Sequence, residues 1–301
     1  MKKQPILLLE GGALRGLYTA GVLDVLMEND LYLPQVVGVS AGALNGLNYL
    51  SHQPGRSLEA NMRFLHDPRY MGPIHLLREF NFFNFDFVLG EMAHDLLPFD
   101  FETFYNSNQR LWAVATDCRT GKPIFYENKK MGQEFLTACR ASASMPLLSS
   151  MVRVGRDVCL DGGIADPLPL PQDLGIETGP AVLVLTRQKG FRKKPLPKAS
   201  QRLVLRRYSR YPQLMGACLA QPALYNRRMD EIDRLEAEGK VFVIRPKDPV
   251  NVPHTEQNLH KLQDLYDRGH AETEALLPAL LDYLGIPKPE PESKISEFSA
   301  E

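Results

Sequence analysis

The residues best suited to covalent chemistry lie between Gly38 and Gly42, a run that reads Gly-Val-Ser-Ala-Gly. An apolar strand pattern leads into this run and a helical pattern leads out of it, so the sequence predicts a strand-to-helix turn with Ser40 at its apex. The two glycines leave room for the tight backbone of such a turn. The N-terminus of the helix that follows favours developing negative charge. We therefore expect Ser40 to act as a nucleophile in acyl transfer.

A serine nucleophile needs a base from another segment of the chain, because its hydroxyl is a weak nucleophile until the proton is removed. Asp161 is the candidate: it follows the apolar pattern of residues 152–160 and precedes Gly162 and Gly163. The carboxyl end of a strand is where an α/β sheet places groups that act on a ligand. An Asp-Gly-Gly run is also common in turns. The assignment of Asp161 as the base therefore depends on the presence of Ser40.

A third segment, residues 10–16, reads Glu-Gly-Gly-Ala-Leu-Arg-Gly between a predicted strand and a predicted helix. Such a loop presents backbone N–H groups to an anion, and acyl transfer requires these donors for the tetrahedral oxyanion. Arg15 either adds positive charge or anchors the loop. A nucleotide-binding loop fits poorly, because Ala13 stands where that pattern needs glycine and no Gly-Lys-Ser/Thr follows. For this segment taken alone, an ordinary structural turn is the alternative.

The elements that must position these segments are short apolar runs alternating with amphipathic helical patterns, which predict βα units and a mostly parallel sheet. The predicted strands are Ile6–Leu9, Val36–Val39, Leu111–Thr116, Pro123–Tyr126, Val152–Leu160, Ala181–Leu185 and Val241–Ile244. The predicted helices are Leu17–Glu28, Ala41–Leu50, Met131–Ala141 and Leu259–Leu284. We expect a catalytic domain over residues 1–190, an α-rich region over 191–285 whose late strand completes or flanks the core, and a disordered tail over 286–301.

The composition excludes several classes of function. The 301 residues are 44% hydrophobic and 24% charged with a net charge of −1, so the whole chain has no strong attraction for nucleic acid or anionic membranes. The four cysteines form no C-x-x-C pair and no metal-ligand spacing, so we expect no disulfide framework, no metal and a cytoplasmic location. No apolar run reaches the roughly 18 to 20 residues of a transmembrane helix.

Two segments have a biased composition. Phe80–Phe87 holds five aromatic residues in eight, which predicts either the lining or lid of an acyl pocket, or a core strand with alternate phenylalanines inward. Arg187–Arg210 holds ten basic residues and no acidic one. This stretch either attracts anionic phospholipids, with the protein peripheral at the inner membrane face, or is a solvated loop leading into a helix. No nucleic-acid-binding module accompanies it, so we expect no nucleic acid partner.

The glycine-rich loop, the Gly-x-Ser-x-Gly run and the Asp-Gly-Gly run, in this order, resemble the patatin-like phospholipases. The resemblance covers residues 5–175 and includes Thr116-Asp117, Ala141–Pro146, Pro167 and Pro169. It implies a three-layer α/β/α fold and a lipid acyl hydrolase without a cofactor. By this resemblance Ser40 is the nucleophile, Asp161 the base, and the oxyanion donors are the N–H groups of Gly11, Gly12 and Ala13. The supporting residues are Arg15, Gly16, Gly38, Gly42, Gly162 and Gly163. Ala13 is a departure, because the family has glycine there.

Histidine is the usual partner of a catalytic serine, and seven histidines are available: His52, His66, His75, His94, His254, His260 and His270. The last three follow Asp161, as the third member of a Ser-Asp-His triad would. None of the seven lies in a recognisable motif, and the resemblance favours a Ser-Asp dyad. Two other functions share these residues: an acyltransferase that uses the same acyl-enzyme, and an idle protein that only holds a lipid or recruits a partner.

Overall fold

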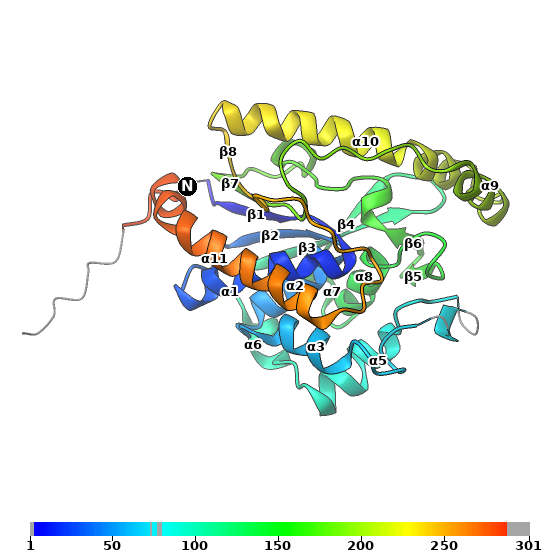
Figure 1. Cartoon of the computed structure of the whole chain (residues 1–301), viewed down its shortest axis with the longest axis horizontal. Helices are drawn as coiled ribbons and strands as arrows, with labels where there is room; N and C mark the ends of the chain where they lie inside the picture. The colour runs from blue at the N-terminus through cyan, green and yellow to red at the C-terminus, as the bar shows by residue number, and fades with distance from the viewer. Residues whose placement is uncertain (1–2, 73, 77–79, 288–301) are drawn as a thin grey trace, which may run out of the picture.

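A computed structural model describes residues 3–72, 74–76 and 80–287, which form a three-layer α/β/α fold (Figure 1). The tail was predicted over 286–301, and its part from residue 288 onward lies outside the described residues. The central sheet has eight strands: β1 (Ile6–Leu9), β2 (Gln35–Val39), β3 (Arg110–Asp117), β4 (Pro123–Glu127), β5 (Val152–Val154), β6 (Asp157–Asp161), β7 (Ala181–Val184) and β8 (Val241–Ile244).

The sheet is mostly parallel, in the order β5-β6-β3-β2-β1-β7-β8, with β4 paired to β3. Strands β4 and β6 run antiparallel to β3, and β5 runs antiparallel to β6. The prediction of one strand over 152–160 is wrong in one respect. The chain turns back between β5 and β6 at Gly155, whose φ of 55° lies in the left-handed region that glycine adopts without strain.

Helices cover both faces of the sheet. They are α1 (Gly16–Glu28), α2 (Ala41–Leu50), α3 (Arg56–Phe64), α5 (Phe85–Leu89), α6 (Phe101–Asn106), α7 (Asn128–Met131), α8 (Glu134–Ser142), α9 (Lys198–Arg207), α10 (Pro212–Ala237) and α11 (Leu259–Leu284). In Figure 1, α1, α2 and α11 lie on one side of the sheet and α10 lies on the other. The sequence analysis did not predict α10 or the short helices between residues 56 and 106.

Alternate side chains of β1 enter two separate cores. Leu7 and Leu9 belong to a core with residues of α1, α2 and α11, whereas Ile6 and Leu8 belong to a core with residues of α10. A strand buried on both faces reads as a continuous apolar run, as this one does. The two cores fix the sheet from both sides and hold its carboxyl edge in place.

The C-terminal helix α11 packs directly on the first helix α1. A Cβ atom built on Gly21 of α1 would lie 2.3 Å from the carbonyl oxygen of Tyr266, and one on Gly269 of α11 would lie 2.2 Å from that of Tyr18. Only glycine permits this approach of the two backbones. Segments at opposite ends of the chain are therefore joined in one layer. None of the helices in the described part of the chain is long and apolar enough to cross a membrane.

Candidate active site

The register of strand β3 brings Ser40 and Asp161 together. Val39, the last residue of β2, pairs with Val114 of β3, and Asp161, the last residue of β6, pairs with the next residue, Ala115. The ends of two strands that are 121 residues apart therefore meet at neighbouring positions of a third strand. There Ser40 Oγ donates a hydrogen bond to Asp161 Oδ2 over 2.6 Å.

Ser40 occupies the strained turn that its flanking glycines predict. Its φ of 56° and ψ of −122° are rare for a residue with a side chain. A Cβ atom at Gly38 would lie 2.5 Å from the backbone of Ala43, and one at Gly42 would lie 2.3 Å from the carbonyl oxygen of Leu9. Both glycines are required because the backbone passes too close for any side chain.

The strained turn is held from the side by Ser142, a residue whose contact the sequence analysis missed. The N–H of Ser40 donates to Ser142 Oγ over 2.8 Å, and Ser142 is fully buried at the end of α8. This N–H is consequently engaged and does not face an oxyanion. The stretch Ala141–Pro146 was noted only as part of the family resemblance, and no spacing in it indicated a contact with Ser40.

Asp161 is held in one orientation by its own turn. Its Oδ1 accepts the N–H of Gly163 over 2.8 Å, which leaves Oδ2 for Ser40. Thr116 Oγ1 donates to the backbone carbonyl of Asp161 over 2.8 Å. A Cβ atom at Gly162 would lie 2.1 Å from the carbonyl oxygen of Val114, so this position also requires glycine.

The carboxyl group of Asp161 is buried, and burial raises its pKa to about 6 because the charged form loses its hydration. The hydrogen bonds from Ser40 and Gly163 oppose this rise in pKa, and so does the positive charge of Lys193. At neutral pH the group is therefore ionised but more basic than an ordinary aspartate. A base with a pKa just below the working pH is well suited to remove a proton from serine.

The glycine-rich loop lies against the dyad. A Cβ atom at Gly11 would lie 2.8 Å from the Cβ of Ser40, and one at Gly16 would lie 2.9 Å from the Cβ of Ala41. Within the described residues, the N–H groups of Gly11, Gly12 and Ala13 donate no hydrogen bond to the protein. Ala13 has a φ of 48°, so it adopts the left-handed backbone that glycine would take more easily.

No histidine completes a triad within the described part of the chain. Six histidines make contacts, none of them with Ser40 or Asp161: His52 on Tyr32, His66 on Gln257, His75 on Pro68, His94 on Phe101, His254 on Arg15 and His270 on Glu28. His260 lies on α11. Among the described residues, the side chain of Ser40 forms a hydrogen bond with Asp161 alone.

An apolar cavity opens beside Ser40. Its walls come from the glycine-rich loop, from α2, α3 and α5, and from the turn of π-helix at Met92–Leu96. The aliphatic and aromatic residues of its lining include Leu14, Leu17, Leu44, Leu47, Ala60, Tyr70, Phe83, Phe85, Val88, Leu89, Met92, Phe99, Phe101, Leu136 and Met145. Such a lining suits a hydrocarbon chain.

The aromatic segment contributes to this cavity, but not as a strand. Phe83 and Phe85 line the cavity, whereas Phe87 is buried in the core. The core-strand interpretation is wrong, because Asn84 accepts the N–H of Phe87 through its side chain and begins helix α5. Among the described residues, Phe80 is the most exposed of the large apolar side chains.

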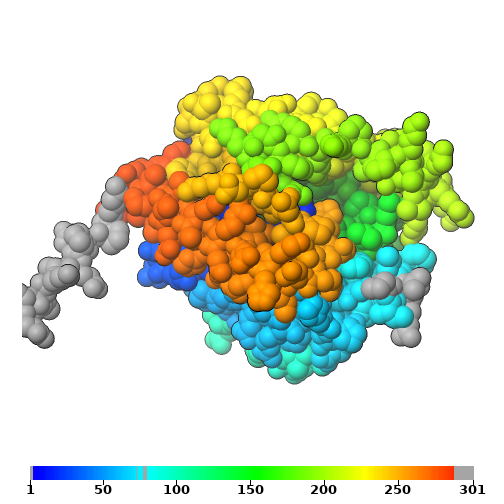
Figure 2. Space-filling view, viewed as in Figure 1, coloured from blue at the N-terminus to red at the C-terminus, as the bar shows by residue number. Residues whose placement is uncertain are grey.

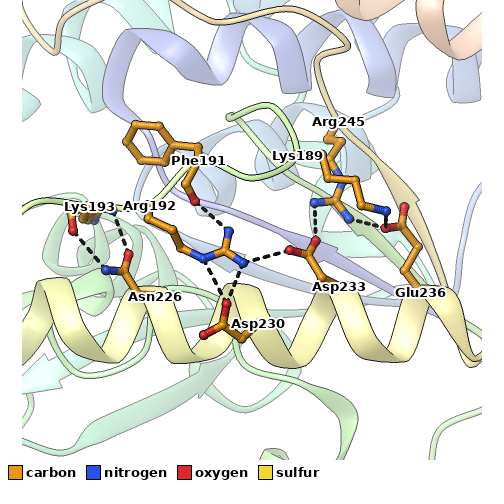
Figure 3. A network of polar contacts seen from close by, with 9 residues as sticks. All are labelled: Lys189, Phe191, Arg192, Lys193, Asn226, Asp230, Asp233, Glu236 and Arg245. Atoms are coloured by element: carbon orange, nitrogen blue, oxygen red, sulfur yellow. Dashed lines mark hydrogen bonds and ion pairs between the residues drawn. The ribbon is translucent and has the colours of Figure 1, made fainter.

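The basic stretch Arg187–Arg210 divides into two parts. Its first part is fixed on α10, where Arg192 pairs with Asp230 and Asp233 and Lys189 pairs with Glu236 (Figure 3). Its second part is helix α9, which projects from the edge of the molecule (Figures 1 and 2). The alternative of a solvated loop leading into a helix is therefore right about the helix, but the loop before it is held by ion pairs.

Comparison with known proteins gives two family matches. The model of the patatin-like phospholipase family matches residues 7–174, and that of a domain of unknown function (DUF6363) matches residues 211–285. The first match contains the glycine-rich loop, Ser40 and Asp161. The second contains α10, β8 and α11.

The chain is also similar to several relatives in sequence and to a solved structure in fold. An uncharacterized protein of Escherichia coli K12, YjjU, is 30% identical over 190 residues, which is 60% of this chain and 51% of the relative. An uncharacterized NTE family protein of Mycobacterium tuberculosis is 26% identical over 185 residues, 59% and 48% of the two chains. The chain thus matches about half the length of these relatives. The crystal structure of VipD from Legionella pneumophila has a similar fold, with a TM-score of 0.50 and 14% identity over 93% of this chain and 67% of that one.

Proposed function

The chain belongs to the patatin-like phospholipase family, and we propose that it hydrolyses lipid acyl esters through an acyl-Ser40 intermediate with Asp161 as the base. The observation that carries this proposal is the 2.6 Å hydrogen bond from Ser40 Oγ to Asp161 Oδ2, where Ser40 also lines an apolar cavity. A strained serine, a base of raised pKa and unoccupied backbone donors are the parts that acyl transfer requires.

The reaction then has two halves. Asp161 takes the proton of Ser40 as its oxygen attacks the ester carbonyl, and the N–H groups around Gly11, Gly12 and Ala13 stabilise the oxyanion. The ester C–O bond breaks, and Asp161 returns the proton to the departing alcohol. Water next attacks the acyl-serine and gives its proton to Asp161. The free fatty acid leaves, and Ser40 regains its proton.

The apolar cavity supports a lipid as the substrate. Phe83 and Phe85 lie on its wall, and Ser40 belongs to the same lining. Burying an acyl chain there gains roughly 0.8 kcal/mol for each methylene removed from water. The ester carbonyl of a chain inserted in this way would lie beside Ser40.

One experiment tests the hydrolase. Purified protein is assayed with a medium-chain p-nitrophenyl ester and a fluorogenic phospholipid, and is labelled with a fluorophosphonate probe. We expect turnover and labelling by the wild type, and loss of both in Ser40→Ala. Folded wild-type protein that shows neither, with or without a lipid interface, would indicate the idle lipid-binding protein instead.

The same acyl-enzyme could pass its acyl group to an alcohol. Product analysis with an added lysolipid acceptor separates the two reactions, because hydrolysis yields free fatty acid and transfer yields a diacyl lipid. Free fatty acid as the main product supports the hydrolase. Diacyl lipid as the main product would make the protein an acyltransferase.

We also propose that α9 makes peripheral contact with anionic membranes. Lys198, Arg202, Arg206 and Arg207 lie on this helix and have no ion pair in the described part of the chain. Leu203 and Leu205 are 51% and 44% exposed, and Arg207 lies 5.6 Å from the ring of Phe80, which is itself 59% exposed. Exposed apolar side chains among unpaired cations are typical of a surface that binds an anionic bilayer.

Vesicle flotation tests this contact. Arg202→Gln combined with Arg206→Gln should weaken binding to vesicles with anionic lipid about tenfold or more, because each basic residue contributes roughly 1 kcal/mol near such a surface. Binding to neutral vesicles should not change. The matched control is Lys189→Gln, whose side chain pairs with Glu236. Equal binding by the double variant and the wild type would contradict the proposal.

A further inference from the structure

Two arginines of the described chain, Arg15 and Arg187, are buried or half-buried and make no ion pair, although the charge of Glu10 acts on both. Arg15 reaches from the glycine-rich loop to the carbonyl oxygen of Val252, over 3.4 Å, and to His254. Arg187 follows β7, donates to the carbonyl oxygen of Val250, and lies over the ring of Phe191. Within the described residues neither arginine makes an ion pair with a carboxylate, and neither lines the apolar cavity.

Lys193 is the third cation of this group. Its ammonium lies 4.2 Å from the centre of the Tyr225 ring, and it also has no ion pair in the described part of the chain. It is close enough to Asp161 that each charge shifts the pKa of the other group. Glu10 lies close enough that its charge raises the pKa of all three cations; it is buried and accepts two hydrogen bonds from Thr186.

The position of Lys193 is set by its backbone. Asn226 of α10 accepts the N–H of Lys193 over 2.7 Å and donates to its carbonyl oxygen over 2.9 Å (Figure 3). The neighbouring cation Arg192 is neutralised by Asp230 and Asp233 of the same helix. The backbone of Lys193 is thus fixed on α10, while its ammonium makes no ion pair in the described part of the chain, unlike the guanidinium of Arg192.

One buried polar atom of this group lacks a hydrogen-bond partner among the described residues: Nε of Arg15, a residue that is 7% exposed. A buried donor left unpaired costs roughly 1–3 kcal/mol. Such an atom calls for an explanation, for example a functional role or a bound ion. The buried hydroxyl of Tyr225 lies near the carboxylate of Glu10, which together with burial raises the pKa of Tyr225.

The three cations destabilise one another. Burial lowers the pKa of Lys193 to about 8; the charge of Glu10 opposes this fall, the charges of Arg15 and Arg187 add to it, and that of Asp161 opposes it. Burial, followed by the charge of Arg187, lowers the pKa of Arg15 to about 10. An anion placed among them would relieve this repulsion, because opposite charge favours the protonated form of each group.

We propose that Arg15, Arg187 and Lys193, together with the hydroxyl of Tyr225, form a subsite for a phosphate group beside the scissile ester. Arginine forks and a lysine point charge are the usual partners of phosphate oxygens. The phosphate is that of a lipid head group or a free phosphate ion. The head-group assignment deepens the proposed lipid hydrolase and rests on it, whereas the binding of phosphate does not.

Binding is measured first, by calorimetry, with sn-glycerol 3-phosphate, inorganic phosphate and neutral glycerol as the probes. Wild-type protein should bind both phosphates and not glycerol. Lys193→Gln and Arg187→Gln should each weaken phosphate binding about tenfold or more, the loss of one charge-assisted contact. Lys193→Arg should retain most of the affinity, and Lys189→Gln, which removes a paired cation of the same segment, should retain all of it. Equal affinity in wild type and Lys193→Gln would overturn the subsite.

Turnover then separates the two sources of phosphate. The substrates are 1-acyl-glycerol 3-phosphate and the 1-monoacylglycerol of the same chain length, which differ only in the phosphate. In the wild type, kcat/KM should be higher for the phosphate ester, and Lys193→Gln should lower the ratio of the two values about tenfold. A ratio that does not change, with phosphate binding lost, would assign the site to a free anion and overturn the head-group assignment.

A structural role for Lys193 gives a different result. Equal losses of kcat/KM on both substrates, with no loss of phosphate affinity, would mean that the lysine only supports the fold, and the proposal would be wrong. Melting temperature identifies variants that fail to fold. Because calorimetry does not require turnover, a wild type that binds glycerol phosphate but hydrolyses no ester would contradict the proposed function and not the subsite.

Discussion

The apolar cavity and the cationic group both adjoin the dyad, but the chain builds them in different ways. The residues that line the cavity lie between Ala13 and Met145, in the first half of the chain. The cationic group joins Arg15 to Arg187, Lys193 and Tyr225, and to the carbonyl groups of Val250 and Val252, from segments far apart in the sequence. The first region acts through shape and apolar area, the second through unpaired charge. An amphipathic substrate presents a chain to one and a head group to the other.

The largest effect should come from the dyad, which both regions serve. Ser40→Ala and Asp161→Asn should each lower kcat about 1,000-fold or more on every ester, since they remove the nucleophile and its base. Substrates with and without phosphate should be affected alike. Steady-state assays on both classes check this. Substantial activity in Asp161→Asn would mean that another group acts as the base.

A smaller and more selective effect should follow from filling the cavity. Ala60 is buried on α3 and lines the cavity, so Ala60→Phe places a ring where the acyl chain would lie. The kcat/KM for a long-chain ester should fall about 10- to 100-fold, because each excluded methylene loses roughly 0.8 kcal/mol. A two-carbon ester should change little. A chain-length series of p-nitrophenyl esters measures this selectivity.

The control for this substitution is Ala220→Phe, which adds the same ring at an exposed position of α10. It should leave the chain-length profile unchanged. If Ala60→Phe lowered the rates of all chain lengths equally, the cavity would not be the acyl site. The preference for phosphate-bearing substrates should be the same in both variants, since the cationic group is untouched.

On the acidic side of the pH profile, kcat/KM should change about tenfold for each pH unit. The raised pKa of Asp161, about 6, predicts that kcat/KM rises with pH and levels off above that value, because only the carboxylate can accept the proton. At pH 5 the rate should be about a tenth of the plateau. A pH profile on a neutral ester measures this limb. A limb with a midpoint near pH 4, the value of an unperturbed aspartate, would exclude the buried Asp161 as its cause.

The smallest effect, a shift of the acidic limb of the pH profile, distinguishes the cationic group from the apolar cavity most directly. The positive charge of Lys193 lowers the pKa of Asp161, so Lys193→Gln should move the acidic limb to higher pH. Ala60→Phe should leave the limb in place, because it changes no charge. The same pH profiles on a short neutral ester provide the measurement. A limb displaced equally by both variants would mean that the two regions are not independent.

The sequence predicted the motif-bearing elements well and the connecting ones poorly. The bounds of α2, β8 and α11 agree with the predicted Ala41–Leu50, Val241–Ile244 and Leu259–Leu284. Strands that are buried on both faces can be recognised in the sequence as continuous apolar runs. Helix α10 was missed because its single buried stripe is diluted by polar residues and contains Pro222. The aromatic segment was misread because a local cap, Asn84, decided between strand and helix.

By itself the sequence determined which segments carry reactive groups, because a strained turn, a base after a strand and a glycine-rich loop each need particular residues in a short span. Only the tertiary structure decided which groups meet. The pairing of β3 with both β2 and β6 places the carboxyl group of Asp161 within hydrogen-bond distance of the Ser40 hydroxyl. Ion pairs with α10 neutralise Lys189 and Arg192 but leave Lys193 unpaired. The physical reason is that charge acts through distance in space, and the ten basic residues of one stretch look alike until their acidic neighbours are known.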